Sequence, residues 1–317
     1  MYSKSEFKNK IENAISIAIL GHIRPDGDCV GSCLGLYNYI IDNYENKVVD
    51  VFLEPIVDKF KFISGSDKIK HEPVDKIYDL AVSLDCSDRD RHGDFINIFP
   101  NAKDTICLDH HKSNLGFGNY FYCDSEASST CEVLFRHLDY DKIGIECAKA
   151  IYLGIVHDTG VFKYQATSCE TMKIAGELLN KGVNSQQIID DTFYKVSYKQ
   201  NKITGEALLN AKLFYEGKVI CSCITTDIFE KYEATKSDTD GIIDKLRVTD
   251  GVEVAIFIYQ LDDNKYKFSL RSVSYVDVSK IAVSYGGGGH MRAAGFEASG
   301  DYEEILSDIL GKIEEDL

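Results

Sequence analysis

The sequence predicts an α/β protein in which a domain built on a parallel sheet, with helices on both faces, precedes a smaller α/β domain. Short apolar runs alternate with helical patterns over the first half of the chain, which is typical of parallel sheets connected by helices. The length of 317 residues suits two domains of ordinary size. Residues 186–211 are polar and helical in pattern, without a strand signal, so we expect them to connect the two domains.

Four apolar runs predict the strands of the first domain: Ile15–Leu20, Val48–Leu53, Leu80–Leu84 and Thr105–Leu108. Four further segments predict helices: Gly31–Tyr44, Ser129–Leu138, Ile145–Val156 and Thr171–Asn180. The apolar residues of the first helical segment fall on one side of a helix, and Lys181-Gly182 ends the last one. The first domain is therefore expected to span residues 1–185.

The second domain, expected to span residues 212–317, repeats this alternation on a smaller scale. Its predicted strands are Lys218–Ile224, Val252–Gln260 and Tyr266–Arg271. Its predicted helices are Thr225–Tyr232, Asp240–Arg247 and Tyr302–Ile313.

Charge and composition limit the classes of partner. The chain has 35 basic and 51 acidic residues and a formal net charge of −16, so long nucleic acid is expected to be repelled. There is no signal-peptide pattern and no apolar run near the roughly 20 residues of a membrane helix, so we expect a cytoplasmic protein. The ten Cys are scattered without a CxxC pair, and we interpret them as small core residues.

Acidic and histidine side chains follow several of the predicted strands. The first strand is followed by His22, Asp26 and Asp28, the third by Asp85, and the fourth by Asp109, His110 and His111. Ligands of open α/β sheets gather at the carboxyl ends of strands. Asp158 lies in the apolar end of a predicted helix, where a carboxylate is costly unless it is paired or bound to a metal. These side chains are candidate members of one site.

The residue types in this group indicate metal chemistry. Asp26 and Asp28 would point to opposite sides of an extended loop, which suits two neighbouring ions; alternatively, Asp28 caps the helix that follows. Carboxylates and imidazoles suit Mn²⁺, with Mg²⁺, Co²⁺ or Fe²⁺ as alternatives, and no Cys stands out as a ligand. A pair of such ions commonly catalyses the hydrolysis of phosphate esters.

The second domain contains a run of four glycines, Gly286–Gly289, directly before His290. Backbone amides without a neighbouring Cβ can approach an anion closely. Arg271 ends the last predicted strand before this run and is a candidate partner for a phosphate or carboxylate. The alternatives are a flexible hinge for the glycines and a surface salt bridge for the arginine.

Taken together, these motifs resemble those of the DHH phosphoesterase superfamily. Asp109-His110-His111 is the signature that gives the superfamily its name, and His22-x-x-x-Asp26-x-Asp28, Asp85 and Asp158-Thr159-Gly160 match its other metal motifs in order and approximate spacing. The glycine run with His290 and Ala293-Ala294-Gly295 resembles the motif of the DHH-associated C-terminal domain. The resemblance covers nearly the whole chain.

The resemblance implies a role for each matching residue. One ion would be held by His22, Asp26 and Asp85, and the other by Asp28, Asp85, His110 and Asp158, so that Asp85 bridges the two. His111 would act on the scissile phosphate, with Asp109 orienting a neighbouring histidine. Phosphates of the substrate would be held by Arg271, His290 and the glycines Gly287, Gly288 and Gly289, while Asn114, Ser128 and Ser129 would line the site.

Length and architecture favour the stand-alone enzymes of this superfamily, which degrade very short RNA (nanoRNA) or remove the 3′-phosphate of 3′-phosphoadenosine 5′-phosphate. We therefore expect a hydrolase with two divalent ions in the cleft between the domains, where they activate a hydroxide. Its partners would be short oligoribonucleotides or small nucleotides, with no long nucleic acid and no membrane. Two alternatives stay open: the protein could be a phosphodiesterase dedicated to cyclic or linear di-adenylate, or a nucleotide sensor that does not hydrolyse its ligand. Whether the chain forms a homodimer also stays open.

Overall fold

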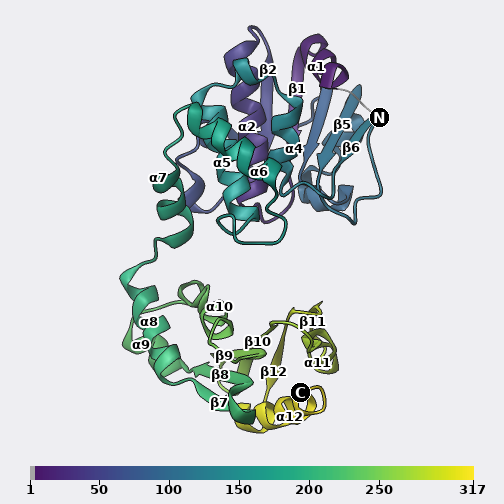
Figure 1. Cartoon of the computed structure of the whole chain (residues 1–317). Coiled ribbons are helices and arrows are strands. Elements are labelled where there is room, and N and C mark those ends of the chain that lie inside the picture. The colour runs from purple at the N-terminus through teal and green to yellow at the C-terminus, as the bar shows by residue number, and fades with distance from the viewer. Residues whose placement is uncertain (1–3) are drawn as a thin grey trace. The chain divides into compact units, whose positions relative to one another are not determined.

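The structure is a computed structural model that describes residues 4–317 and divides into two compact units (Figure 1). The boundary lies between Lys195 and Val196, within the stretch predicted as a connector. Helix α7 (Ser185–Ile189) and the π-helical turn Asp190–Tyr194 belong to the first unit. Helix α8 (Tyr198–Leu209) buries apolar side chains in the second unit. The predicted connector is therefore not a separate element. Its first half packs on the first unit and its second half on the second unit.

The first unit contains a six-stranded sheet in which all neighbouring strands are parallel, in the order β3-β2-β1-β4-β5-β6. The strands are β1 (Ser16–Leu20), β2 (Val48–Phe52), β3 (Ile69–Lys70), β4 (Leu80–Leu84), β5 (Asp104–Asp109) and β6 (Tyr120–Cys123). Strand β4 is buried at every position, which explains its continuous apolar run. The predicted parallel sheet is confirmed, and the structure adds two edge strands, β3 and β6.

Helices cover one face of this sheet, and they include every long helix of the unit. They are α1 (Lys4–Asn13), α2 (Gly27–Asn43), α4 (Thr130–His137), α5 (Ile145–Asp158) and α6 (Cys169–Asn180). Helix α2 is buried along most of its length, and α5 packs closely on it. The other face is covered by the 3₁₀ segment η3 (Arg89–Phe95) and the short helix α3 (Ile98–Asn101). Both faces of the sheet are therefore covered by helical segments, as predicted. The long helices cover one face, and only short helical turns cover the other.

The second unit contains a six-stranded mixed sheet in the order β11-β12-β10-β9-β8-β7, in which only β8 and β9 are parallel. Its strands are β7 (Lys212–Phe214), β8 (Val219–Ile224), β9 (Val254–Asp262), β10 (Lys265–Ser272), β11 (Gly288–His290) and β12 (Ala293–Ser299). One face packs on α8 and α10 (Ile242–Arg247), and the other on α11 (Val278–Ser284) and α12 (Tyr302–Glu314).

Helix α9 (Thr226–Lys231) and five 3₁₀ turns complete the described chain. The turns are η1 (Asp58–Phe60), η2 (Ser66–Lys68), η4 (Tyr140–Lys142), η6 (Tyr215–Gly217) and η7 (Lys236–Thr239). Within residues 4–317, none of the helices combines the length and the apolar character needed to cross a bilayer.

One buried carboxylate, Glu253, fixes the loop that follows β10. Its Oε1 accepts hydrogen bonds from the backbone N–H groups of Ser274 (3.1 Å), Tyr275 (2.8 Å) and Val276 (3.1 Å), and its Oε2 accepts one from the Ser274 hydroxyl (2.7 Å). Burial raises the pKa of Glu253, but these hydrogen bonds outweigh burial and hold the pKa below its ordinary value.

We expect Glu253→Gln to destabilise the protein by about 1–3 kcal/mol at neutral pH, because several of these bonds lose their charged acceptor. A lowered pKa contributes stability that is present above the unfolded pKa and lost as the pH falls through the folded pKa. The difference between parent and variant should therefore shrink on acidification, as measured by urea unfolding at a series of pH values. The exposed Glu315→Gln is the control, and equal stability of all three proteins at neutral pH would contradict the prediction.

Candidate functional site

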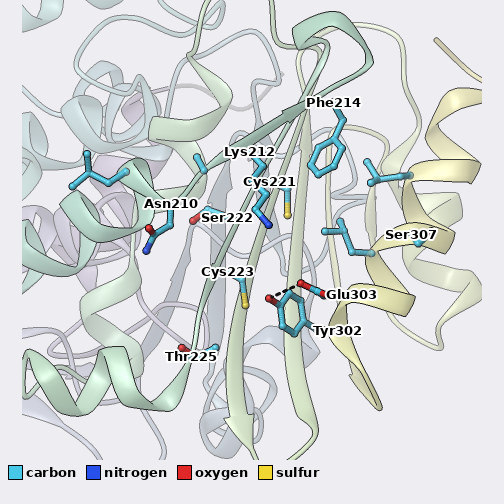
Figure 2. A pocket seen from close by; sticks show the side chains of 14 residues that line it. Asn210, Lys212, Phe214, Cys221, Ser222, Cys223, Thr225, Tyr302, Glu303 and Ser307 are labelled. Carbon is cyan, nitrogen blue, oxygen red and sulfur yellow. Dashed lines mark hydrogen bonds between the residues drawn. The ribbon is translucent and has the colours of Figure 1, made fainter.

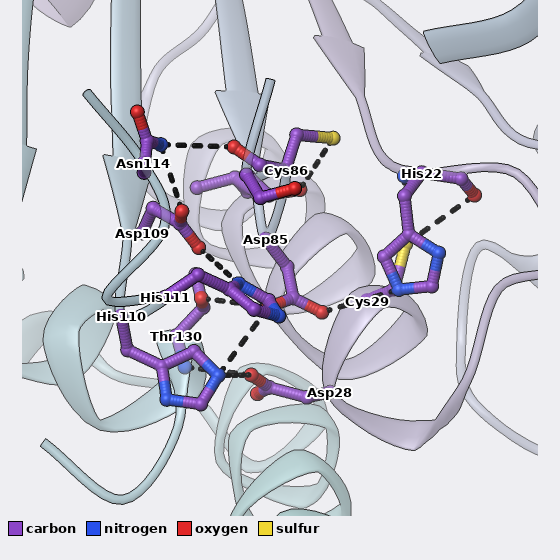
Figure 3. A network of polar contacts seen from close by, with 12 residues as sticks. His22, Asp28, Cys29, Asp85, Cys86, Asp109, His110, His111, Asn114 and Thr130 are labelled. Carbon is purple, nitrogen blue, oxygen red and sulfur yellow. Dashed lines mark hydrogen bonds and ion pairs between the residues drawn. The ribbon is translucent and has the colours of Figure 1, made fainter. Parts of the chain in front are cut away.

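The carboxyl ends of three neighbouring strands supply the centre of the site. His22 follows β1, Asp85 follows β4, and Asp109 ends β5 directly before His110 and His111. These strands lie in the order β1-β4-β5, so their ends meet at one edge of the sheet. Two further carboxylates come from helices: Asp28 lies in the first turn of α2, and Asp158 is the last residue of α5. The structure thus brings together the residues that the sequence places at separate strand ends (Figure 3).

One side of the cluster is formed by His22, Asp26 and Asp85. His22 Nε2 lies 3.6 Å from Asp26 Oδ2 and 3.4 Å from Asp85 Oδ2. His22 Nδ1 lies 2.7 Å from its neighbour's carbonyl oxygen, that of Ile23, which leaves Nε2 free to face the carboxylates. The cap of α2 is Asp26, whose Oδ1 accepts from two backbone N–H groups. Asp28 is therefore not the helix cap that the sequence left as an alternative.

The other side of the cluster is formed by Asp28, His110 and Asp158. His110 Nε2 lies 3.1 Å from Asp158 Oδ2, 3.9 Å from Asp28 Oδ2 and 3.7 Å from Asp85 Oδ1. The two oxygens of Asp85 thus face different histidines, Oδ2 toward His22 and Oδ1 toward His110. Asp85 lies between the two sides of the cluster, as a shared ligand would.

Two features of Asp85 and Asp28 were not evident from the sequence. The backbone of Asp85 is left-handed, with φ of 61°, a conformation that Asp and Asn tolerate better than most residues. Thr130, at the start of α4, donates its hydroxyl to Asp85 Oδ1 (3.0 Å) and its backbone N–H to Asp28 Oδ2 (2.6 Å). Cys131 N–H donates to Asp28 Oδ1 (2.9 Å). The N-terminus of α4 therefore orients two carboxylates of the cluster.

The electrostatics of the cluster favour cations. Burial lowers the pKa of His110, but Asp158, Asp28 and Asp85 outweigh burial and raise it to about 10. The pKa of Asp28 is raised by its complete burial and by the charges of Asp85 and Asp158. Carboxylates that repel one another in a buried position need positive charge close by. The histidines supply it when protonated, and metal ions would supply more.

The donor atoms fit divalent metal ions. Three groups of three donor atoms lie within 4.8 Å of one another: His22, Cys29 and Asp85; Asp85, His110 and His111; and Asp28, His110 and Asp158. Imidazole nitrogens and carboxylate oxygens are suitable ligands for Mn²⁺, Fe²⁺, Co²⁺ and Zn²⁺. The groups contain five of the six ligands that the family resemblance implies, and the sixth, Asp26, is in none of them. They also contain His111, which the resemblance assigns to the substrate, and Cys29, which the sequence analysis did not select.

His111 is held at the edge of the cluster by Asp109. His111 Nδ1 lies 2.8 Å from Asp109 Oδ1, and this hydrogen bond is the main reason why the pKa of His111 is raised. Asp109 Oδ2 accepts from Asn114 Nδ2 (2.7 Å), and Asn114 also donates to the carbonyl oxygen of Cys86 (2.9 Å). The resemblance implied that Asn114 lines the site. In the structure Asn114 is buried and instead holds Asp109 in place.

Ser128 and Ser129 do not line the site either, because both are buried and bonded to Glu132. Ser128 Oγ donates to Glu132 Oε2 (2.6 Å), and Ser129 Oγ accepts from the Glu132 N–H as the cap of α4. Glu132 also accepts from Thr171 Oγ1 (2.7 Å). This network fixes the loop just before Thr130. No sequence pattern indicates that Thr130 would bond to the carboxylates of the cluster.

In the second unit, Arg271 and His290 lie in one row across three strands. His290 of β11 is opposite Ala293 of β12, which in turn is opposite Arg271 of β10. Arg271 is half-buried and donates to the carbonyl oxygen of Leu270, and within residues 4–317 no carboxylate forms an ion pair with it. The surface salt bridge that the sequence left as an alternative is not formed.

The glycine run is part of the sheet rather than a free hinge. Gly288 and Gly289 pair with β12. A Cβ on Gly287 would lie 2.4 Å from the Gly295 carbonyl oxygen, and one on Gly289 would lie 2.4 Å from that of Ala293. Glycine is therefore required at both positions by close backbone packing.

The second unit also contains a large groove of about 770 Å³, lined by α12, β7, β8 and the end of α8. Its walls include Cys221, Cys223 and Tyr302 (Figure 2). None of the predicted site residues lines it, so it has no place in the candidate site.

Comparisons with known proteins agree with the geometry. The model of the DHH family, N-terminal domain, matches residues 16–155, and that of the DHHA1 domain matches residues 216–316. A probable bifunctional oligoribonuclease and PAP phosphatase NrnA of Streptococcus mutans is 32% identical over 90% of both chains. The bifunctional enzyme of that name from Bacillus subtilis is 27% identical over 96% of this chain and 97% of its own.

Among solved structures, an exopolyphosphatase-related protein from Bacteroides fragilis is similar over 98% of this chain and 95% of its own. The TM-score is 0.85 and the sequence identity is 27%. The matched domains, the identity over most of the chain and the shared fold lead to one conclusion. The chain belongs to the DHH family and carries a DHHA1 domain.

Proposed function

We propose that this chain is a cytoplasmic, metal-dependent phosphoesterase that hydrolyses short oligoribonucleotides to mononucleotides, or 3′-phosphoadenosine 5′-phosphate to AMP, or both. The observation that carries the proposal is the convergence of five carboxylates and three histidines at one edge of the first sheet. The relatives named as oligoribonuclease and PAP phosphatase support the choice of substrates.

Two divalent ions, for which we propose Mn²⁺, would be held by the ligand sets that the resemblance implies. His22, Asp26 and Asp85 would hold one, and Asp28, Asp85, His110 and Asp158 the other. When bound, such ions lower the pKa of a water and neutralise charge on the phosphate. Asp85 would serve both ions because its two oxygens face opposite sides of the cluster.

His111 would act on the substrate rather than on a metal. Asp109 engages Nδ1 and so leaves Nε2 for the phosphate or the leaving oxygen. The raised pKa of His111 favours the protonated ring, which can donate a proton or stabilise negative charge. In the second unit, Arg271 and His290 would hold phosphate oxygens, with the amides of the glycine run beside them.

A substrate panel tests the proposal. Turnover of an RNA trimer, 3′-phosphoadenosine 5′-phosphate, linear diadenylate and cyclic diadenylate is compared in Mn²⁺. Cleavage of the first two supports the proposal. Cleavage confined to the diadenylates would identify a dedicated di-adenylate phosphodiesterase, and binding without any product would identify a sensor.

Substrate length gives a sharper prediction. We expect dinucleotides to roughly pentanucleotides to be cleaved faster than long RNA, because an acidic chain gains little from additional phosphates. The log–log dependence of affinity on salt should have a slope of about one to two, as for one or two phosphate contacts. Initial rates are measured on RNA of two to about twenty-five nucleotides at two salt concentrations. A rate that rises with length would contradict the prediction.

Arg271→Ala should lower the catalytic efficiency on short substrates without removing metal. The matched control is Arg247→Ala, since Arg247 lies in the same unit and pairs with Asp244 of its own helix. Equal losses in the two variants would show that Arg271 has no specific contact with substrate.

A further inference from the structure

Cys29 lies inside the candidate metal centre. Its Sγ, a ring nitrogen of His22 and a carboxylate oxygen of Asp85 all lie within 4.8 Å of one another. Figure 3 shows the sulfur beside the His22 ring. Ligands of one ion at about 2.0–2.3 Å lie at most about 4.5 Å apart, so small movements would bring all three onto the same ion.

The local structure holds this sulfur against the backbone that carries His22, and its S–H donates to the His22 carbonyl oxygen (3.9 Å). The cap by Asp26 fixes the first turn of α2, including the backbone N–H of Cys29. The Cys29 Sγ accepts a hydrogen bond from the backbone N–H of His22 (3.3 Å). A Cβ on Gly21 would lie 2.3 Å from this sulfur, so the loop carrying His22 wraps closely around it. The thiol is fully buried.

We propose that Cys29, as a thiolate, is an additional ligand of the ion held by His22, Asp26 and Asp85. This inference rests on the metal centre of the proposed function. Binding would replace the S–H bond with a sulfur–metal bond and release the proton to solvent, with no change of oxidation state. A sulfur ligand favours Co²⁺, Zn²⁺ or Fe²⁺ over Mg²⁺. The interpretation of all ten Cys as core residues is already wrong for Cys169, which is exposed, and would fail at Cys29 as well.

Cobalt binding tests the proposal without reference to activity. Apo protein is titrated with Co²⁺ and observed by absorption spectroscopy. Visible ligand-field bands report the metal centre, and a near-ultraviolet sulfur-to-cobalt charge-transfer band reports the thiolate. The parent should show both. Cys29→Ala should keep the ligand-field bands, lose the charge-transfer band and bind one Co²⁺ at least about tenfold more weakly.

Cys33→Ala is the matched control, because Cys33 is an equally buried thiol one helical turn further along α2 and belongs to none of the three donor groups. It should retain the charge-transfer band. Cys29→Ser replaces Cys29→Ala if the latter does not fold, and should also lose the band. An indicator dye should record about one more proton released per chain by the parent than by the Cys29 variants.

The outcomes separate this inference from the proposed function. Ligand-field bands without a charge-transfer band in the parent, or a charge-transfer band that survives loss of Cys29, would overturn the thiolate ligand and leave the metal centre intact. No cobalt bound by the parent would overturn the metal centre itself, and the thiolate ligand with it.

Discussion

Replacement of Asp85 by Asn is expected to abolish hydrolysis and to weaken binding of both proposed ions. Its two carboxylate oxygens face His22 and His110 on opposite sides of the cluster, so one substitution affects both sides. Asn is preferred to Ala because the backbone φ of 61° at this position is one that Asn tolerates. The loss of affinity should exceed the roughly 10–100-fold effect of losing an outer partner of a ligand.

The measurements are initial rate and metal content by elemental analysis after dialysis against a fixed Mn²⁺ concentration. Asp88→Asn is the control, since Asp88 is an exposed carboxylate three residues away whose capping of η3 an Asn can replace. A nearly normal rate with two ions per chain in Asp85→Asn would contradict the shared-ligand role.

Replacement of His111 by Ala is expected to lower the rate by about 10²–10⁴-fold while the metal content stays unchanged. The His111 side chain is 40% exposed at the edge of the cluster, and its Nδ1 is engaged by Asp109. It is therefore positioned to meet a substrate. His71→Ala, which removes an exposed histidine near the edge strand β3, should leave the rate unchanged.

Adjacent His110 provides the contrast. Its Nε2 lies within 3.9 Å of three carboxylates, so His110→Ala should lose metal as well as rate. Metal content and the single-turnover rate at saturating Mn²⁺ distinguish the two roles. If His111→Ala loses metal and His110→Ala retains it, the two assignments are reversed.

Much of the fold was predictable because the central strands are buried on both faces. Strand β4 begins and ends where its apolar run does. Elements held by few apolar residues were missed. Helix α1 buries only Phe7 and Ile11, and β12 consists mainly of small residues that become a strand by pairing with β10 and β11. A local sequence pattern cannot predict a strand that forms because of the strands it pairs with.

Order and spacing along the chain were enough to predict which side chains share one edge of the first sheet. A parallel sheet aligns the ends of its strands, so His22, Asp85 and Asp109 were expected at the same edge. The structure then showed that β1, β4 and β5 are neighbours, which brings the three side chains together. The sequence also indicated the family, because the motifs occur in a fixed order along the chain. Both conclusions depend on order and spacing, which a sequence contains.

The contacts that hold these groups in place could not be predicted from the sequence. The hydroxyl and amide of Thr130 orient Asp85 and Asp28 across 45 and 102 residues of chain, and the reason is the packing of α4 against α2. The position of Cys29 beside His22 likewise depends on the turn of α2 and on the close approach of the preceding loop. Contacts made by packing between distant segments leave no local pattern, and so they appear only when the chain is folded.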